Sequence, residues 1–172
     1  ILDIMNTKII FGIIGAAVLI VGSVLWNESR KADKIQALES SGDLVSQTGI
    51  HWHPELSITI KGEKQLIPAN IGIGMQYAGY PLYDPIMRMT DVHTHDAFGT
   101  LHWEVTEGPV KKEDVRLGNF FAIWGKKFDE TCIFESCNGP EGTMTMLVNG
   151  KENTEFQNYL VNDKDKIEIR YE

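Results

Sequence analysis

The sequence has little positive charge and lacks several common catalytic motifs. Its 172 residues include 16 Lys and Arg against 24 Asp and Glu, for a formal net charge of -8. Nucleic-acid binding needs clustered Lys and Arg that neutralise phosphates, so no nucleic-acid partner is expected. The chain has no G-x-S-x-G elbow, no P-loop, no C-x-x-C-H haem motif and no terminal Gly-Gly. These absences argue against the common serine, phosphate, haem and conjugation chemistries.

Cysteine is also scarce, with only Cys132 and Cys137 in the segment TCIFESC. The two residues are close enough to close a small loop by a disulfide in an oxidising compartment. The alternative is a cytoplasmic C-x4-C metal pair, although that spacing is loose for zinc. We favour the disulfide, which would leave no thiol for catalysis.

One apolar run stands out near the N-terminus. Residues 9–26, IIFGIIGAAVLIVGSVLW, carry no charge and reach the lower length limit for crossing a bilayer. The run ends in VLWNESRK without a small-x-small cleavage site, which favours an uncleaved anchor over a signal peptide. We therefore predict a membrane anchor over residues 1–26, with its helix at about 9–26. A polar stalk and linker over 27–49 would then lead to a folded domain over 50–172.

The orientation of that anchor depends on two conflicting signals. Arg30, Lys31 and Lys34 follow the apolar run and only Lys8 closely precedes it, which favours a cytoplasmic domain. The cysteine pair favours an oxidising compartment, and we give it more weight. The prediction is a single-pass protein of the cell membrane, facing the periplasm or the cell exterior. Its expected partners are the membrane and an integral membrane complex.

Hydrophobic periodicity predicts a small α+β domain. Alternation in LSITIKGEKQLIP, TLHWEV, TMTMLVNGKE and DKIEIRYE indicates strands and hairpins. In LGNFFAIWG the apolar residues form one stripe of a short helix that Gly125 ends. Because this stripe must be covered by a sheet, we predict a β-grasp-like domain, with β-hairpins packed on one short helix. Residues 69–90 are expected to form a long loop near the histidines.

All five histidines lie in two short segments, GIHWHPEL and VHTHDAFGTLHW. If the second segment is a hairpin turning through residues 96–99, His93 lies opposite His102 and His95 lies opposite Thr100. The three imidazoles would then share one face, away from the apolar side chains of Leu101 and Trp103. A slip of one residue would expose Trp103, so the alternation protects this register.

Converging imidazoles predict a metal site for copper or zinc, because three of them can hold either ion and leave one position open. The predicted ligands are His93, His95, His102, His51 and His53. The alternative is a set of surface histidines that only form hydrogen bonds. Met87 and Met89 are candidate Cu(I) ligands, although methionine is more often core filler.

Three functions follow from such a site. The first, which we favour over an enzyme, is a membrane-anchored extracytoplasmic protein that binds copper or zinc or delivers it to a membrane partner. The second is a zinc-dependent hydrolase or hydratase in which Glu104 or Asp96 moves protons. The third is an accessory subunit of a membrane complex with a structural metal. Asp96 and Glu104 also suit hydrogen bonds to the ligand rings or direct coordination, while Asp96 alone suits a turn.

The motifs HWHPEL, HTHDAFGTLHWE and LGNFFAIWG occur in this order along the chain. In this respect the sequence resembles a prokaryotic family of membrane-anchored extracytoplasmic proteins with H-x-H, H-T-H-D-x-x-G-x-L-H-x-E and L-G-x-F-F-x-x-W-G segments. The resemblance covers nearly all of residues 51–172. It implies the anchor, the domain limits and the importance of the five histidines, and it implies no activity.

Overall fold

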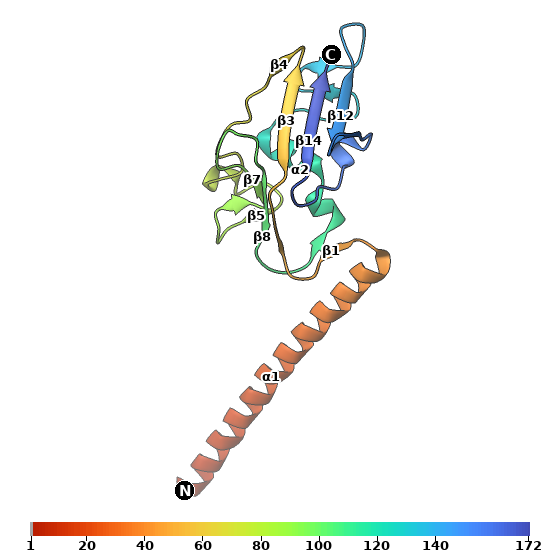
Figure 1. Ribbon diagram of the computed structural model, residues 1–172. Helices are drawn as coiled ribbons and strands as arrows, with labels where there is room; N and C mark the ends of the chain where they lie inside the picture. The colour runs from red at the N-terminus through yellow and green to blue at the C-terminus, as the bar shows by residue number, and fades with distance from the viewer. Residues whose placement is uncertain (1) are drawn as a thin grey trace. The chain divides into compact units, whose positions relative to one another are not determined.

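The computed structural model describes residues 2–172, and side chains from residue 18 onward (Figure 1). The chain divides into two compact units, one ending at Asp43 and one running from Leu44 to Glu172. The second unit holds every strand and all five histidines. It begins before residue 50 because the short strand β1 (Leu44–Ser46) pairs with β9 (Val110–Lys111).

Helix α1 (Leu2–Ser41) forms the first unit. Within the part of the chain that the structure describes, no helix is both long and apolar enough to cross a membrane. This finding contradicts the predicted membrane helix over residues 9–26, together with the single-pass periplasmic or exterior location that depended on it. Residues 9–17 of that run lie outside the residues whose side chains are described. The described apolar stretch, 18–26, is followed by charged residues, and a bilayer needs about 20 apolar residues.

The largest sheet of the second unit, which we call the central sheet, has the strand order β13-β12-β14-β3-β4. Figure 1 labels β12, β14, β3 and β4 side by side. Strand β14 runs parallel to β3 and antiparallel to β12. Alternate residues of these strands are buried, which is the pattern of a sheet with one face on a core. The strands are β3 (Glu55–Ile60), β4 (Glu63–Lys64), β12 (Met144–Val148), β13 (Lys151–Glu152) and β14 (Lys166–Tyr171).

The short helix predicted from the aromatic stripe is present as α2 (Leu117–Trp124). It ends at Gly125, which takes the left-handed conformation at φ 71° and caps the last turn through its backbone N–H. Leu117, Phe120 and Phe121 are buried and belong to the same apolar core as the inward side chains of the sheet. Met144 and Met146 are part of this core and are therefore packing residues.

The remaining strands form four small sheets. The histidine segments lie in a three-stranded sheet of order β2-β8-β7, separate from the central one. Its strands are β2 (Ile50–Trp52), β7 (Val92–His93) and β8 (His102–Val105). The β1–β9 pair is the second small sheet. The other two are hairpins, formed by β5 (Tyr83–Asp84) with β6 (Met89–Thr90) and by β10 (Cys132–Ile133) with β11 (Ser136–Cys137). Short 3-10 helices occupy Met75–Tyr77, Lys112–Val115 and Phe156–Asn158.

This arrangement corrects the predicted fold class. The described chain is mostly β-structure with two α-helices, and its strands fall into five sheets. It therefore does not show the β-grasp-like α+β domain that we predicted. Alternation identified individual strands, but it carries no information on which strands share a sheet.

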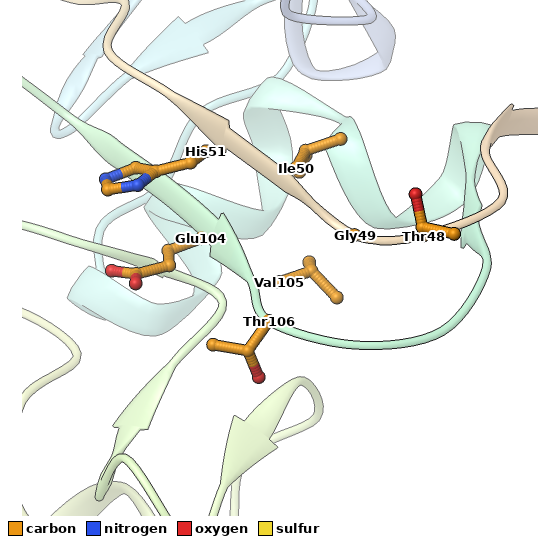
Figure 2. A pocket seen from close by; sticks show the side chains of 7 residues that line it. All are labelled: Thr48, Gly49, Ile50, His51, Glu104, Val105 and Thr106. Atoms are coloured by element: carbon orange, nitrogen blue, oxygen red, sulfur yellow. The ribbon is translucent and has the colours of Figure 1, made fainter.

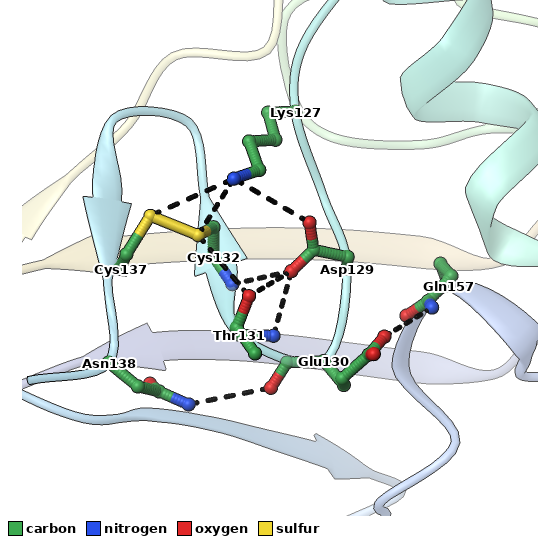
Figure 3. Close-up of polar contacts among 8 residues, drawn as sticks. All are labelled: Lys127, Asp129, Glu130, Thr131, Cys132, Cys137, Asn138 and Gln157. Atoms are coloured by element: carbon green, nitrogen blue, oxygen red, sulfur yellow. Dashed lines mark hydrogen bonds and ion pairs between the residues drawn. A yellow bond between two sulfur atoms is a disulfide. The ribbon is translucent and has the colours of Figure 1, made fainter.

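The predicted disulfide between Cys132 and Cys137 is confirmed, and it joins two residues that face each other across the β10–β11 hairpin. Around it, the Lys127 ammonium donates to the Cys132 sulfur at 3.0 Å (Figure 3). The Asp129 carboxylate accepts hydrogen bonds from the hydroxyl of Thr131 and from the backbone N–H groups of Thr131 and Cys132. The Thr131 hydroxyl bond is the largest influence lowering the pKa of Asp129. The loop is thus held by hydrogen bonds as well as by the covalent link.

Replacing both cysteines with serine should lower the free energy of unfolding only modestly. The cysteines are five residues apart, and the entropy of closing so short a loop corresponds to about 2 kcal/mol. Denaturant unfolding of the parent and of the C132S/C137S variant measures this difference. An unchanged midpoint would mean that the Asp129 hydrogen bonds alone hold the loop.

Candidate metal centre

The register of the histidine sheet brings imidazoles from three strands to one face. His93 on β7 pairs with His102 on β8, which confirms the predicted register. On the other edge of β8, strand β2 pairs His51 with Glu104. Continuing that antiparallel register places His53 beside His102, and their ring centroids are 4.8 Å apart. Strand β8 is therefore the centre of the cluster.

One detail of the predicted hairpin is wrong. His95 lies beyond the end of β7, and Thr100, its predicted partner, bridges instead to Glu55 of the central sheet. His95 nevertheless reaches the cluster, with its ring centroid 4.5 Å from that of His102 and 4.8 Å from that of His93.

The five side chains form two overlapping triads. One consists of His93, His95 and His102, and the other of His51, His53 and His102. Within each triad, the ligand nitrogens lie within 4.8 Å of one another. His93 is fully buried and His102 is half-buried, whereas the remaining three imidazoles are exposed. We call the first set the inner triad and the second the outer triad.

The buried ring of His93 is fixed in one tautomer. Its Nδ1 lies 2.9 Å from the carbonyl oxygen of Thr90, which can only accept a hydrogen bond. Nδ1 therefore carries the proton, and the lone pair of the neutral ring is on Nε2. That Nε2 lies 3.2 Å from Nε2 of His95. Two nitrogens at about 2.0 to 2.1 Å from a tetrahedral zinc ion are about 3.3 Å apart, so this pair already has the spacing of two ligands.

The surroundings keep two of these imidazoles neutral. Burial is the main cause that lowers the pKa of His93 from its ordinary value of 6.5. Burial, followed by repulsion from the four neighbouring imidazoles, lowers the pKa of His102 from 6.5 to about 4. Neutral imidazole is the form that coordinates metal ions. These two ligands are therefore ready to bind at neutral pH without losing a proton.

The lowered pKa of His102 predicts acid sensitivity in the metal-free protein. Between about pH 6.5 and 4 the unfolded chain binds a proton at His102 that the folded chain does not, so this residue's contribution to stability is lost as pH falls. A His102→Gln variant lacks this contribution. The free energy of unfolding of the parent, relative to the variant, should therefore fall across that interval in urea titrations with a chelator present.

The comparison with a variant is needed because Asp91 acts in the opposite direction. Burial, and repulsion from Asp114 and Asp84, raise the pKa of Asp91 to about 7. Both proteins contain this carboxyl group, so its effect cancels in the difference. A difference that does not change with pH would contradict the lowered pKa of His102.

The other residues considered from the sequence have different positions. The Asp96 carboxylate accepts a hydrogen bond from the backbone of Phe98, as expected of a turn residue. Glu104 lies next to His51 on the adjacent strand and lines a hollow with it (Figure 2). Met87 lines another hollow, together with Asp91 and others. Met89 pairs with Asp84 in the β5–β6 hairpin, so neither contact places a thioether among the imidazoles.

Sequence reasoning missed three residues that support the cluster. Thr90 orients His93 through a backbone carbonyl, which leaves no trace in residue type. The Asp163 carboxylate accepts a hydrogen bond from the backbone N–H of His53, although the two residues are 110 positions apart in the sequence. Gly72 lies against Thr90, Val92 and His93, and its residue type was the one available signal, since glycine often marks a close backbone approach.

No protein-family model matches the chain, and neither curated proteins nor solved structures show a significant similarity to it.

Proposed function

We propose that the Leu44–Glu172 unit binds a divalent transition-metal ion, copper or zinc, through its histidine cluster. The observation that carries the proposal is the geometry of the inner triad. His93 is buried, its Nδ1 proton is committed to the Thr90 carbonyl, and its Nε2 lies at ligand spacing from that of His95. A hydrogen bond from the outer ring nitrogen to a backbone carbonyl is the usual support of a metal-binding histidine.

The donor set also limits which ions fit. Imidazole suits both Zn(II) and Cu(II). The two cysteines are joined in a disulfide at another sheet, so they supply no thiolate for a soft ion. The proposed ligands are therefore neutral nitrogens, and the site is expected to prefer these two ions to hard cations such as Mg(II) or Ca(II).

The first test is the metal content of the full chain, purified without a histidine tag. We expect about one Zn(II) or Cu(II) per chain after equilibration with a slight excess and removal of free ion, measured by elemental analysis. The matched control is a variant with all five histidines replaced by glutamine, which should retain none. A folded parent that ignores both added ions would refute the proposal.

A zinc-dependent hydrolase is the second candidate, and one observation favours it. A hollow of about 380 Å³ lies beside the outer triad and is lined by His51, Glu104 and the neighbouring residues Thr48, Gly49, Ile50, Val105 and Thr106 (Figure 2). A three-histidine zinc ion keeps one position for water, and a nearby carboxylate can accept its proton. Glu104→Gln should then leave zinc bound but abolish hydrolysis of an activated ester. If the zinc-loaded parent hydrolyses no ester above the rate of the histidine-free control, this candidate fails.

A further inference from the structure

The cluster is not one five-ligand site. Among the described residues, the donor nitrogens group into two sets of three, and no larger set satisfies the same 4.8 Å limit. The inner and outer triads share a single residue, His102. An ion held by one triad is therefore too far from at least one donor of the other to be bound by all five.

The shared residue makes the two triads compete. A neutral imidazole carries one proton and one lone pair, so it can coordinate only one ion at a time. We infer that the outer triad is a second, alternative position for the same divalent ion, an inference that rests on the proposed function. One ion then occupies either the inner or the outer position, according to the position in which His102 coordinates it.

The two positions differ in strength. The inner triad has a buried ligand whose ring is oriented by the Thr90 carbonyl. In the outer triad, by contrast, the hydrogen bond from His53 to the Asp163 carboxylate is donated by the backbone N–H and does not orient the ring. Loss of an orienting partner typically weakens metal binding by roughly ten- to a hundredfold. The outer position should be weaker by about that factor.

The two positions also differ in access. His51 and His53 are exposed on and next to the edge strand β2, beside the open hollow at Glu104. An ion in the outer position is therefore in contact with solvent, while the inner position reaches the buried ring of His93. The outer triad, with two exposed ligands against one in the inner triad, is therefore the more accessible of the two positions.

Two exposed residues give a matched pair of variants that spare the core. His95→Ala breaks only the inner triad and His53→Ala breaks only the outer one. The full chain is titrated with Zn(II) in competition with a chromophoric chelator, and circular dichroism verifies folding. We expect the parent to bind one ion tightly, and H53A, which keeps the inner position, to lose far less affinity than H95A. H95A should still bind one ion, roughly ten- to a hundredfold more weakly, and H53A/H95A should lose binding further.

The outcomes separate this inference from the proposed function. If H95A binds zinc no better than H53A/H95A while the parent and H53A both bind it tightly, the outer position does not exist and the metal-binding proposal stands. If the parent binds two ions with similar affinity, the competition for His102 is refuted. If neither the parent nor H53A binds zinc, both the inference and the proposed function fail.

Discussion

Replacing His102 with alanine should weaken metal binding more than replacing any other histidine of the cluster. His102 is the one residue common to both triads, so H102A leaves each triad with only two imidazoles. Structural zinc sites bind with roughly 10 to 16 kcal/mol over four ligands, or about 3 kcal/mol for each. We therefore expect at least about a hundredfold loss of affinity in H102A, measured by chelator competition with Zn(II).

The fold should survive this change. His102 is half-buried in the small sheet, and its backbone pairing with His93 does not depend on the side chain. H53A is the matched comparison, because it removes an imidazole of the same cluster and spares the inner triad. An H102A protein that binds zinc as tightly as H53A would contradict the central position of this residue.

The sequence predicted individual strands where a clear period of two was present. Alternating residues in DKIEIRYE and LSITI correspond to β14 and β3. Their parallel pairing could not be predicted, because the two strands are more than 100 residues apart and carry the same pattern as any half-buried strand. For the same reason the sequence did not reveal that the histidine strands form a sheet of their own.

Only the part of the candidate site that depends on strand register within one hairpin could be predicted from the sequence. The pairing of His93 with His102 followed from a short hairpin whose buried residues, Leu101 and Trp103, allow one alignment. The outer triad depends on β2 lying beside β8, a contact between segments about 50 residues apart that no local pattern specifies. The pairing of donors into two triads sharing His102 is therefore a property of the tertiary structure.

The second large effect, on both stability and zinc affinity, is expected at Gly72, which packs against Thr90, Val92 and His93. Its φ is +79°, and an added Cβ would clash with the Thr90 hydroxyl and lie 2.8 Å from the Val92 carbonyl oxygen. Thr90 is held there by hydrogen bonds from its N–H to the Gly72 carbonyl and from its hydroxyl to Val92. A left-handed conformation costs a non-glycine residue about 1 kcal/mol or more, and overpacking adds about 1 to 3 kcal/mol. Gly72→Ala should therefore lower the free energy of unfolding by about 3 kcal/mol.

Gly62 provides the control for this prediction, because its φ of +82° is nearly the same and a Cβ there would meet nothing within 4 Å. Gly62→Ala should show only the conformational part, about 1 kcal/mol. The clash at Gly72 pushes against the segment whose Thr90 carbonyl orients His93, so G72A should also bind Zn(II) more weakly than the parent, by roughly tenfold or more. G62A should bind it normally. Urea unfolding and chelator competition on the same two variants measure both effects, and a G72A protein equal to G62A in stability and zinc affinity would show that Gly72 does not support the site.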